Sequence, residues 1–317
     1  MRILNSNDTL NPDESTIITV GNFDGVHRGH QFLLREAVRL ASENGAKSAA
    51  VTFDPPTRFV TGDANGGQQL TTLEEKVILI GRTGIDYLMC VPFGGAMRKK
   101  EPEAFIEEFL AGRLHMAGWV LGRGHAFGWN RAGNENFLHI MGSKYHFITL
   151  IADLLTQEGS PISSTQIREC VMRGRIAEAV MRLGHPYLIS VERAIGKKLG
   201  TKLGYPTLNF KSPPSRKVIP LPGVYAAELE YKGAYERGAL YFGECPTLQE
   251  HREVHFEFHS FNRGEEEIGT GERAHLWLYS FVRADNVYTG TGELVKQIGR
   301  DIETIKTFFI KEKVQWR

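Results

Sequence analysis

The 317-residue chain has few cysteines, no excess charge of either sign and no long apolar run. Its three cysteines, Cys90, Cys170 and Cys245, are far apart and form no C-x-x-C pair. This spacing argues against a disulfide scaffold and against a zinc cluster. The 38 basic and 37 acidic residues nearly cancel, so the composition does not indicate a general nucleic-acid binder. Any anion-binding site must therefore be local.

No apolar segment approaches the length that is needed to span a membrane. The first fifteen residues are polar and lack the hydrophobic core of a secretion signal. With the cysteine usage, these features lead us to expect a cytoplasmic protein that has no membrane partner. The chain length predicts two domains, and we expect a monomer or a weak oligomer.

The most informative stretch covers residues 17–45. A β-branched run at 17–20 is typical of a buried parallel strand. Turn residues at 21–25 interrupt this run, and the apolar residues then follow a helical period. The pattern predicts a strand, a glycine-rich turn and a helix, with His27 and His30 where the turn enters the helix.

That position suits an anion. The first amides of a helix have no internal partner, the helix dipole is positive there, and glycines allow a phosphate to approach the backbone. Two imidazoles three residues apart, His27 and His30, can both donate to phosphate oxygens. Asp24 cannot bind an anion directly, and we expect it to order the turn or one histidine. A bare H-x-x-H would be explained as well by two incidental histidines.

The full string GNFDGVHRGH at residues 21–30 is more specific. It resembles the G-x-F-D-G-x-H-x-G-H signature of the nucleotidylyltransferase superfamily, and more narrowly the FMN adenylyltransferase half of the bifunctional riboflavin kinase/FAD synthetases. The resemblance implies that His27 and His30 are catalytic. It also implies that five turn residues bind the phosphates of ATP: Gly21, Asn22, Phe23, Asp24 and Gly25.

A second candidate anion site is the string PISSTQIR at residues 161–168. Ser163 or Ser164 can cap the following helix, and hydroxyls, helix-start amides and Arg168 together would suit a phosphate. Taken alone, the string is explained as well by a serine cap and a solvated arginine. It matches the I-S-S-T-x-I-R motif of the same family, which implies that Ser163, Ser164 and Thr165 bind ATP and that Arg168 is catalytic.

Residues 122–128 take the place of the family's G-x-D-F-x-F-G loop. Phe127 matches, whereas Gly124 and His125 depart from the pattern. Phe127 and the nearby Trp129 can stack on a flavin ring. Their alternative role is partial burial in the core.

Apolar runs alternate with helical segments in the first half of the chain. This alternation predicts a parallel sheet with helices on both faces and a ligand beyond the carboxyl ends of the strands. We expect a Rossmann-like nucleotidylyltransferase domain over residues 1–184. The expected strands are 2–4, 17–20, 47–53, 86–91, 119–122 and 147–151, and the expected helices include 73–81 and 102–112.

The second half of the chain reads differently. Short strands separated by Gly, Pro and charge clusters predict an antiparallel β-barrel over residues 185–317, closed by a helix. The expected strands are 225–231, 237–242, 253–261 and 274–281, and the expected closing helix is 293–310. The fold class is therefore α/β plus all-β.

This half resembles the riboflavin kinase module over most of its length. LGYPTLN at residues 203–209 matches G-[FY]-P-T-x-N, and PLPGVY at 220–225 matches P-x-G-V-Y. The resemblance implies that Thr207 and Asn209 bind the Mg²⁺ of MgATP, a hard ion that a hydroxyl and an amide oxygen suit. It implies that Glu253 is the general base on the ribityl 5′-hydroxyl. Otherwise Thr207 and Asn209 satisfy a turn.

The second half also departs from the family. Cys245 replaces a usual arginine, Lys197 replaces a usual glycine, and residues 262–272 replace an aromatic-glycine turn. We therefore expect an Mg²⁺-dependent enzyme that makes FAD from ATP and FMN, with riboflavin phosphorylation left open. The alternatives are an adenylyltransferase with a degenerate kinase domain, a flavin-nucleotide binding module without turnover, and a transferase for phosphopantetheine or nicotinamide mononucleotide.

Overall fold

A computed structural model describes residues 1–62, 67–153, 155–157, 159–196, 198–214, 216–244, 254–262 and 268–312. Backbone contacts divide the chain into two compact units, Met1–Ser164 and Thr165–Arg317. Helix α9 (Ile176–Leu183) packs on strands of the second unit. The domain boundary expected between residues 184 and 185 remains a prediction.

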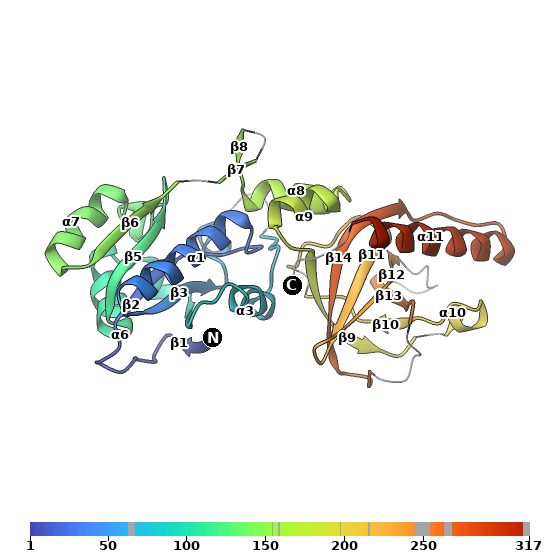
Figure 1. Cartoon of the computed structure of the whole chain (residues 1–317), viewed down its shortest axis with the longest axis horizontal. Helices are drawn as coiled ribbons and strands as arrows, with labels where there is room; N and C mark the ends of the chain where they lie inside the picture. The colour runs from blue at the N-terminus through green and yellow to red at the C-terminus, as the bar shows by residue number, and fades with distance from the viewer. Residues whose placement is uncertain are drawn as a thin grey trace. The chain divides into compact units, whose positions relative to one another are not determined.

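The first unit contains a six-stranded sheet in the order β1-β4-β3-β2-β5-β6, with every neighbouring pair parallel (Figure 1). All six strands were predicted from apolar runs. The strand order reverses between β2 and β5, and ligands bind at such switch points in open α/β sheets. The strands are β1 (Arg2–Asn5), β2 (Thr16–Val20), β3 (Lys47–Asp54), β4 (Tyr87–Pro92), β5 (Met116–Gly122) and β6 (Ile148–Ala152).

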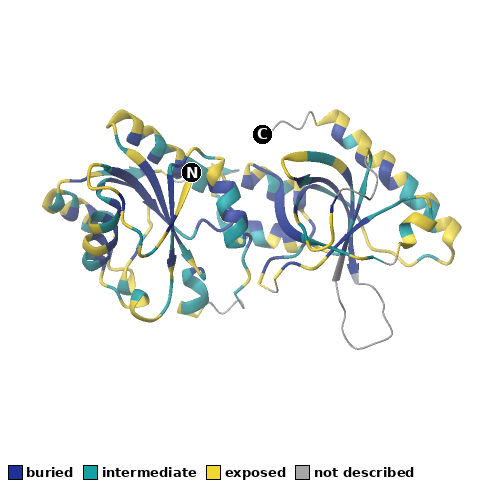
Figure 2. Ribbon diagram, turned by 90° about the horizontal axis from the view of Figure 1, so that it is seen from below, coloured by how far each residue is buried: buried dark blue, intermediate teal, exposed yellow. Residues whose placement is uncertain are grey.

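Helices cover both faces of this sheet, so that its strands are largely buried (Figure 2). Helix α1 (Arg28–Glu43) packs on β2, β3 and β5. The other face carries the main apolar cluster, to which a helical segment at 102–114 and helix α7 (Glu135–Tyr145) contribute. The remaining elements are α2 (Thr57–Thr61), α3 (Leu73–Gly81), α4 (Gly95–Arg98), the 3-10 helix η2 (Trp129–Arg131) and the hairpin β7 (Thr156–Gln157) and β8 (Ser160–Pro161).

Three helix predictions need correction. The apolar residues show the helical period only from Phe32, whereas helix α1 begins at Arg28 because His27 caps it, and it buries Leu34. The predicted helix at 102–112 is α5 (Pro102–Phe105), the π-helix η1 (Ile106–Ala111) and α6 (Gly112–Leu114). The helix expected after residue 163 is broken at Gly174, whose φ is +71°, into α8 (Ser164–Met172) and α9.

The second unit contains a closed barrel of six antiparallel strands in the order β10-β13-β12-β11-β14-β9. The closing helix α11 (Thr291–Lys311) lies against β11, β12 and β14 and buries Ile302, Ile305 and Phe309. The predicted α/β plus all-β fold is confirmed, although β9 and β10 were not predicted. The strands are β9 (Tyr187–Ala194), β10 (Leu208–Phe210), β11 (Gly223–Tyr231), β12 (Ala234–Glu244), β13 (Val254–Ser260) and β14 (Arg273–Ala284), and a short helix α10 (Leu199–Lys202) precedes β10.

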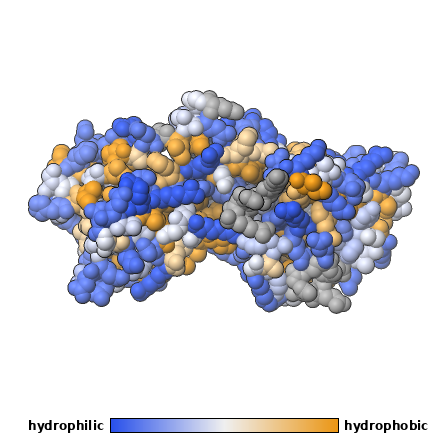
Figure 3. Space-filling view, viewed as in Figure 1, coloured by the Kyte–Doolittle hydropathy of each residue, from blue (hydrophilic) through white to orange (hydrophobic). Residues whose placement is uncertain are grey.

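The surface carries no broad apolar area on the face shown in Figure 3, where hydrophobic residues form small patches among hydrophilic ones. Among the described residues, no helix has both the length and the apolar character that crossing a membrane requires.

Candidate functional site

The histidine turn, residues 21–30, joins β2 to α1 at the carboxyl edge of the sheet. Phe23 and Val26 each have a positive φ, of 45° and 40°, and each is 1% exposed. A positive φ is unusual for a bulky or β-branched residue, and such strain persists only where the surroundings enforce it. The two buried side chains therefore anchor a turn whose backbone conformation is set by the fold.

The two histidines lie together at the start of α1. His27 is the N-cap, and its Nδ1 accepts from the backbone N–H of His30 at 3.4 Å. The two rings stack with centroids 3.6 Å apart, and Phe23 contacts His30 edge-on at 5.4 Å. A Cβ on Gly29 would lie 3.3 Å from the His27 ring, so the glycine leaves room for this ring. The imidazoles thus point the same way, as the spacing predicts.

The surroundings of His30 strongly change its pKa. Its Nδ1 is buried and has no hydrogen-bond partner among the described residues. Burial, and then the charges of His27, Lys76 and His125, lower the pKa of His30 well below its ordinary value. The ring is therefore neutral near pH 7 in the free protein, and a bound anion would favour its protonated form.

An NMR titration of the ring protons tests this state. The midpoint of His30 in the free protein is expected below 6.5, and a non-hydrolysable ATP analogue should raise it because a nearby anion stabilises the imidazolium. His27→Asn should also raise it, since one of the groups that lowers this pKa is removed. A midpoint at or above 6.5 without nucleotide would contradict the electrostatic account.

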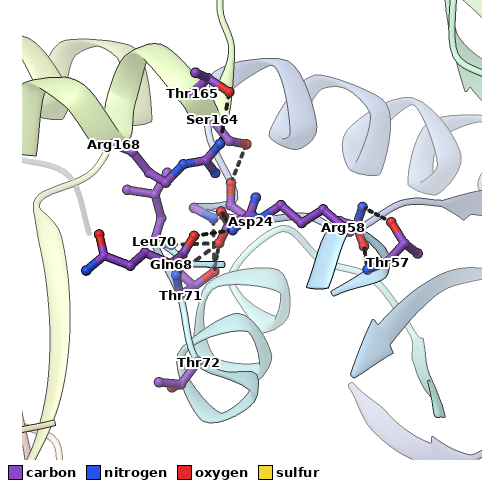
Figure 4. Close-up of polar contacts among 12 residues, drawn as sticks. Asp24, Thr57, Arg58, Gln68, Leu70, Thr71, Thr72, Ser164, Thr165 and Arg168 are labelled. Atoms are coloured by element: carbon purple, nitrogen blue, oxygen red, sulfur yellow. Dashed lines mark hydrogen bonds and ion pairs between the residues drawn. The ribbon is translucent and has the colours of Figure 1, made fainter. Parts of the chain in front are cut away.

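The Asp24 side chain holds the histidine turn in place through hydrogen bonds and an ion pair. Its Oδ1 accepts from the N–H groups of Leu70 (2.8 Å) and Thr71 (3.1 Å), and its Oδ2 pairs with the Arg58 guanidinium at 3.0 Å (Figure 4). The N–H of Gly25 donates to the Thr71 hydroxyl at 2.9 Å. The Asp24 side chain thus fixes the turn, as one of the two roles expected for it, and any contribution to phosphate binding comes through the backbone that it holds.

Two more predicted residues tie the turn to its surroundings. The Asn22 side chain donates to the Thr57 hydroxyl at 2.8 Å and accepts from the Thr57 N–H at 3.0 Å. The Ser164 hydroxyl donates to the Asp24 carbonyl at 2.9 Å (Figure 4). The first residue of α8 is thereby joined to a turn that lies 140 residues earlier.

The other residues of the second motif surround that serine in the chain. Ser163 precedes α8, whereas Thr165 and Arg168 lie within it and are grouped with the second unit. The Arg168 guanidinium donates to the Thr165 hydroxyl at 2.9 Å. Their roles at the ATP phosphates remain predictions.

A cavity of about 490 Å³ lies in the first unit beyond the carboxyl ends of β2 and its neighbours. This volume is within the range of small-ligand sites. Gly21 and Asn22 of the histidine turn line it, and no acidic side chain of the described residues does. Its aromatic lining is Phe53, Phe93, Phe105, Phe127 and Trp129, and its basic lining is Arg98, Lys100, His125 and Arg131.

Both predicted flavin-binding residues line this cavity. Phe127 is 9% exposed, and its ring centroid lies 4.6 Å from that of Trp119 in the core. It is therefore a core residue and a cavity wall together, so the two alternatives for Phe127 do not exclude each other. A flat ring system stacked on such walls would gain both burial and aromatic contact.

Sequence reasoning did not identify Lys76 as part of this region. Lys76 lies in the first turn of α3, directly after the Thr72–Glu75 capping box, and is 1% exposed. Burial lowers its pKa, whereas the charges of Asp24 and Asp54 raise it. No local pattern distinguishes this lysine from a solvated one, because its burial depends on the fold.

In the barrel, the two predicted magnesium ligands lie beside a carboxylate. The Thr207 hydroxyl donates to Glu257 at 3.2 Å, and Asn209 is the partner of Glu257 across β10 and β13. A Cβ on Gly196 would lie 2.2 Å from the Asn209 amide, so a larger residue there would displace the Asn209 side chain. Hydroxyl, amide and carboxylate oxygens in one place suit Mg²⁺, and Glu257 was not predicted.

Some predicted features lie outside the described residues. These are the catalytic candidate Glu253, the departures Lys197 and Cys245, and residues 263–267 of the altered turn. Across the described ranges, no group of three or more His, Cys, Asp or Glu side chains is arranged to hold a metal ion.

Comparison with known proteins covers both halves of the chain. A family model described as FAD synthetase matches residues 10–166, and one described as riboflavin kinase matches residues 183–309. A Streptococcus pneumoniae crystal structure described as a macrolide-efflux protein has a TM-score of 0.84 at 23% identity, covers 96% of this chain and 98% of its own, and shows the fold alone.

Curated relatives match nearly the whole length. The bifunctional riboflavin kinase/FMN adenylyltransferase of Buchnera aphidicola subsp. Schizaphis graminum is 32% identical over 94% of this chain and 95% of its own. The protein of the same description from Escherichia coli K12 is 30% identical over 94% of each chain. The chain therefore belongs to the family of bifunctional riboflavin kinase/FMN adenylyltransferases.

Proposed function

We propose that this protein makes FAD by transferring AMP from ATP to FMN. An oxygen of the FMN phosphate attacks the α-phosphorus of ATP, the bond to the β-phosphate oxygen breaks, and pyrophosphate leaves. No covalent intermediate is required, so catalysis consists of alignment and of neutralising phosphate charge. The observation that supports this function best is the stacked His27–His30 pair beside a cavity with aromatic walls and basic groups.

The histidine pair, the aromatic walls and the second motif have separate roles in this reaction. His27 and His30 donate to the α-phosphate region, where the rings share one direction. Phe127 and Trp129 hold the flavin ring. The proposed pyrophosphate holders are the hydroxyls and guanidinium of the second motif, Ser163, Ser164, Thr165 and Arg168, a role supported by the bond from Ser164 to the turn. Mg²⁺, when bound, supplies further charge neutralisation on the phosphates.

We propose that the barrel phosphorylates riboflavin to FMN. Thr207 and Asn209 hold the Mg²⁺ of MgATP, which neutralises phosphate charge. Glu253 accepts the proton of the ribityl 5′-hydroxyl. The hydroxyl oxygen attacks the γ-phosphorus of ATP, the bond from that phosphorus to the β-phosphate oxygen breaks, and ADP leaves. The oxygen cluster of Thr207, Asn209 and Glu257 supports this assignment. The expected cytoplasmic location and the monomer or weak oligomer remain predictions.

A product assay tests both proposals. Riboflavin with MgATP should yield FMN and then FAD, and FMN with MgATP should yield FAD and pyrophosphate. Glu253→Gln should slow FMN formation from riboflavin by ~10²–10⁴-fold, the usual contribution of a general base, and leave FAD formation from FMN unchanged. FAD made only from supplied FMN would remove the kinase proposal, and flavin binding without pyrophosphate release would indicate a binding module.

A further inference from the structure

The basic groups of the cavity are unevenly placed around the histidine turn. His125 and Arg131 lie on the loop after β5, which is the immediate neighbour of β2 in the sheet. Arg98 follows β4, which β3 separates from β2. Parallel strands end at one edge of the sheet, so loops after adjacent strands lie beside each other. Of the basic residues that line the cavity, His125 and Arg131 therefore lie on the loop next to the histidine turn.

Electrostatic contacts connect these residues to the histidine pair. Arg131 is a charged neighbour of His125, and His125 is in turn one of the groups that act on His30. Within the described ranges no carboxylate forms an ion pair with Arg131, whereas Lys100 is held by Glu108 at 2.5 Å. Arg131 thus brings a cation to the cavity that no neighbouring acid compensates.

The loop that carries them has a fixed and strained backbone. Asn130 and Arg131 are consecutive non-glycine residues with φ of 53° and 58°. Phe127 and Gly133 exchange two backbone hydrogen bonds of 2.8 and 3.0 Å, and the Trp129 N–H donates to the Lys100 carbonyl at 3.0 Å. Strained left-handed residues held in this way are concentrated at ligand clamps.

We propose that Arg131 and His125 bind the phosphate of the flavin acceptor and present its oxygen to the histidine pair. This inference rests on the proposed adenylyltransferase function and assigns the acceptor side of that site. A phosphate monoester carries nearly two negative charges at pH 7. An arginine guanidinium can donate two parallel hydrogen bonds to two of its oxygens. With the ring against Phe127 and Trp129, which both line the cavity, the same cavity takes both ends of a phosphorylated flavin and favours it over riboflavin.

Steady-state kinetics of the full chain tests the assignment. Arg131→Gln should raise the KM for FMN by about 10- to 100-fold, the range for a lost hydrogen bond to a charged group, while the KM for ATP stays within about twofold. In the reverse reaction, from FAD and pyrophosphate, the KM for pyrophosphate should not change. His125→Asn should raise the KM for FMN less, and Arg131→Lys should recover part of the loss because it keeps the charge.

A control variant removes an arginine without removing the proposed contact. Arg123 lies on the same loop but is paired with Asp153 at 2.7 Å and does not line the cavity. Arg123→Gln should leave the KM for FMN within about threefold.

The outcomes separate the two proposals. A wild-type protein that forms no FAD overturns the proposed function itself. A wild-type protein that forms FAD, with an unchanged KM for FMN in Arg131→Gln and His125→Asn, overturns only the acceptor assignment. A rise in the KM for ATP and pyrophosphate instead would place Arg131 at the donor phosphates and also overturn it, as would an equal effect of Arg123→Gln on the KM for FMN.

Discussion

His30→Ala is expected to slow FAD formation from FMN by ~10²–10³-fold, the usual cost of removing one preorganised donor from a developing negative charge. The structure gives a reason for an effect of this size. His30 Nδ1 is buried without a partner, and its ring is held against His27 and Phe23. A donor that is already desolvated and oriented needs no rearrangement when charge develops on the phosphate.

The measurement is kcat for FAD formation at saturating FMN and MgATP. His139→Ala is a matched control, because His139 is an exposed histidine of α7 in the same unit and should keep full activity. Riboflavin phosphorylation by the same polypeptide reports whether His30→Ala leaves the barrel intact. If His30→Ala retained full FAD synthesis, the catalytic assignment of the histidine pair would be wrong.

The sequence was most informative where local chemistry decides the structure. Helix α3 was predicted at its observed bounds, 73–81, and both reciprocal hydrogen bonds of its Thr72–Glu75 capping box are present. All six parallel strands were predicted, and the apolar runs are clearest in the central strands β2, β3 and β5, which are buried on both faces. The family assignment drawn from the motifs is confirmed by relatives that match both halves of the chain.

Features that depend on distant contacts were missed. The π-helical turn at 106–111 was not predicted, since the apolar period of that segment is compatible with an ordinary helix. The short strand β10 exists because β9 and β13 flank it in a closed barrel. Neither feature has a signal within the segment itself that would separate it from a common alternative.

The candidate site shows the same division. The first motif singled out the two histidines that the structure shows stacked. Phe127 and Trp129, predicted to bind flavin, both line the cavity, and their contact with flavin remains a prediction. Arg131 lines the same cavity but was not predicted, because a single arginine in a loop has the same local pattern whether it contacts a ligand or solvent. The contacts of Asp24 could not be predicted either, because its partners at 58 and 70–71 do not belong to any recognisable sequence motif.

Asp24→Ala is expected to destabilise the first unit by about 3 kcal/mol, because removing one partner of a buried ion pair leaves the other uncompensated. The Asp24 side chain is 2% exposed and that of Arg58 is 18% exposed, so the lower end of the usual range applies. The N–H groups of Leu70 and Thr71 also lose their acceptor. In a unit of this size the unfolding midpoint should fall by about 6–12 °C.

The same substitution should also lower FAD formation at least about tenfold, since the turn that holds His27 and His30 loses its anchor. Calorimetry of the full chain, with FAD and FMN formation measured in parallel, distinguishes the two effects. Asp24→Asn keeps an Oδ1 acceptor for Leu70 and Thr71 and should recover part of both losses.

Asp86→Ala is the matched control for this experiment. Asp86 accepts two hydrogen bonds from Ser48 at the amino edge of the same sheet, and its side chain is 40% exposed. We expect a loss of no more than about 1 kcal/mol and unchanged FAD formation. Equal losses of stability and activity in the two variants would show that Asp24 acts only as a general element of the fold. A selective loss of FAD formation in Asp24→Ala would show that the proposed work of His27 and His30 depends on the Asp24 carboxylate, which holds their turn through Arg58, Leu70 and Thr71.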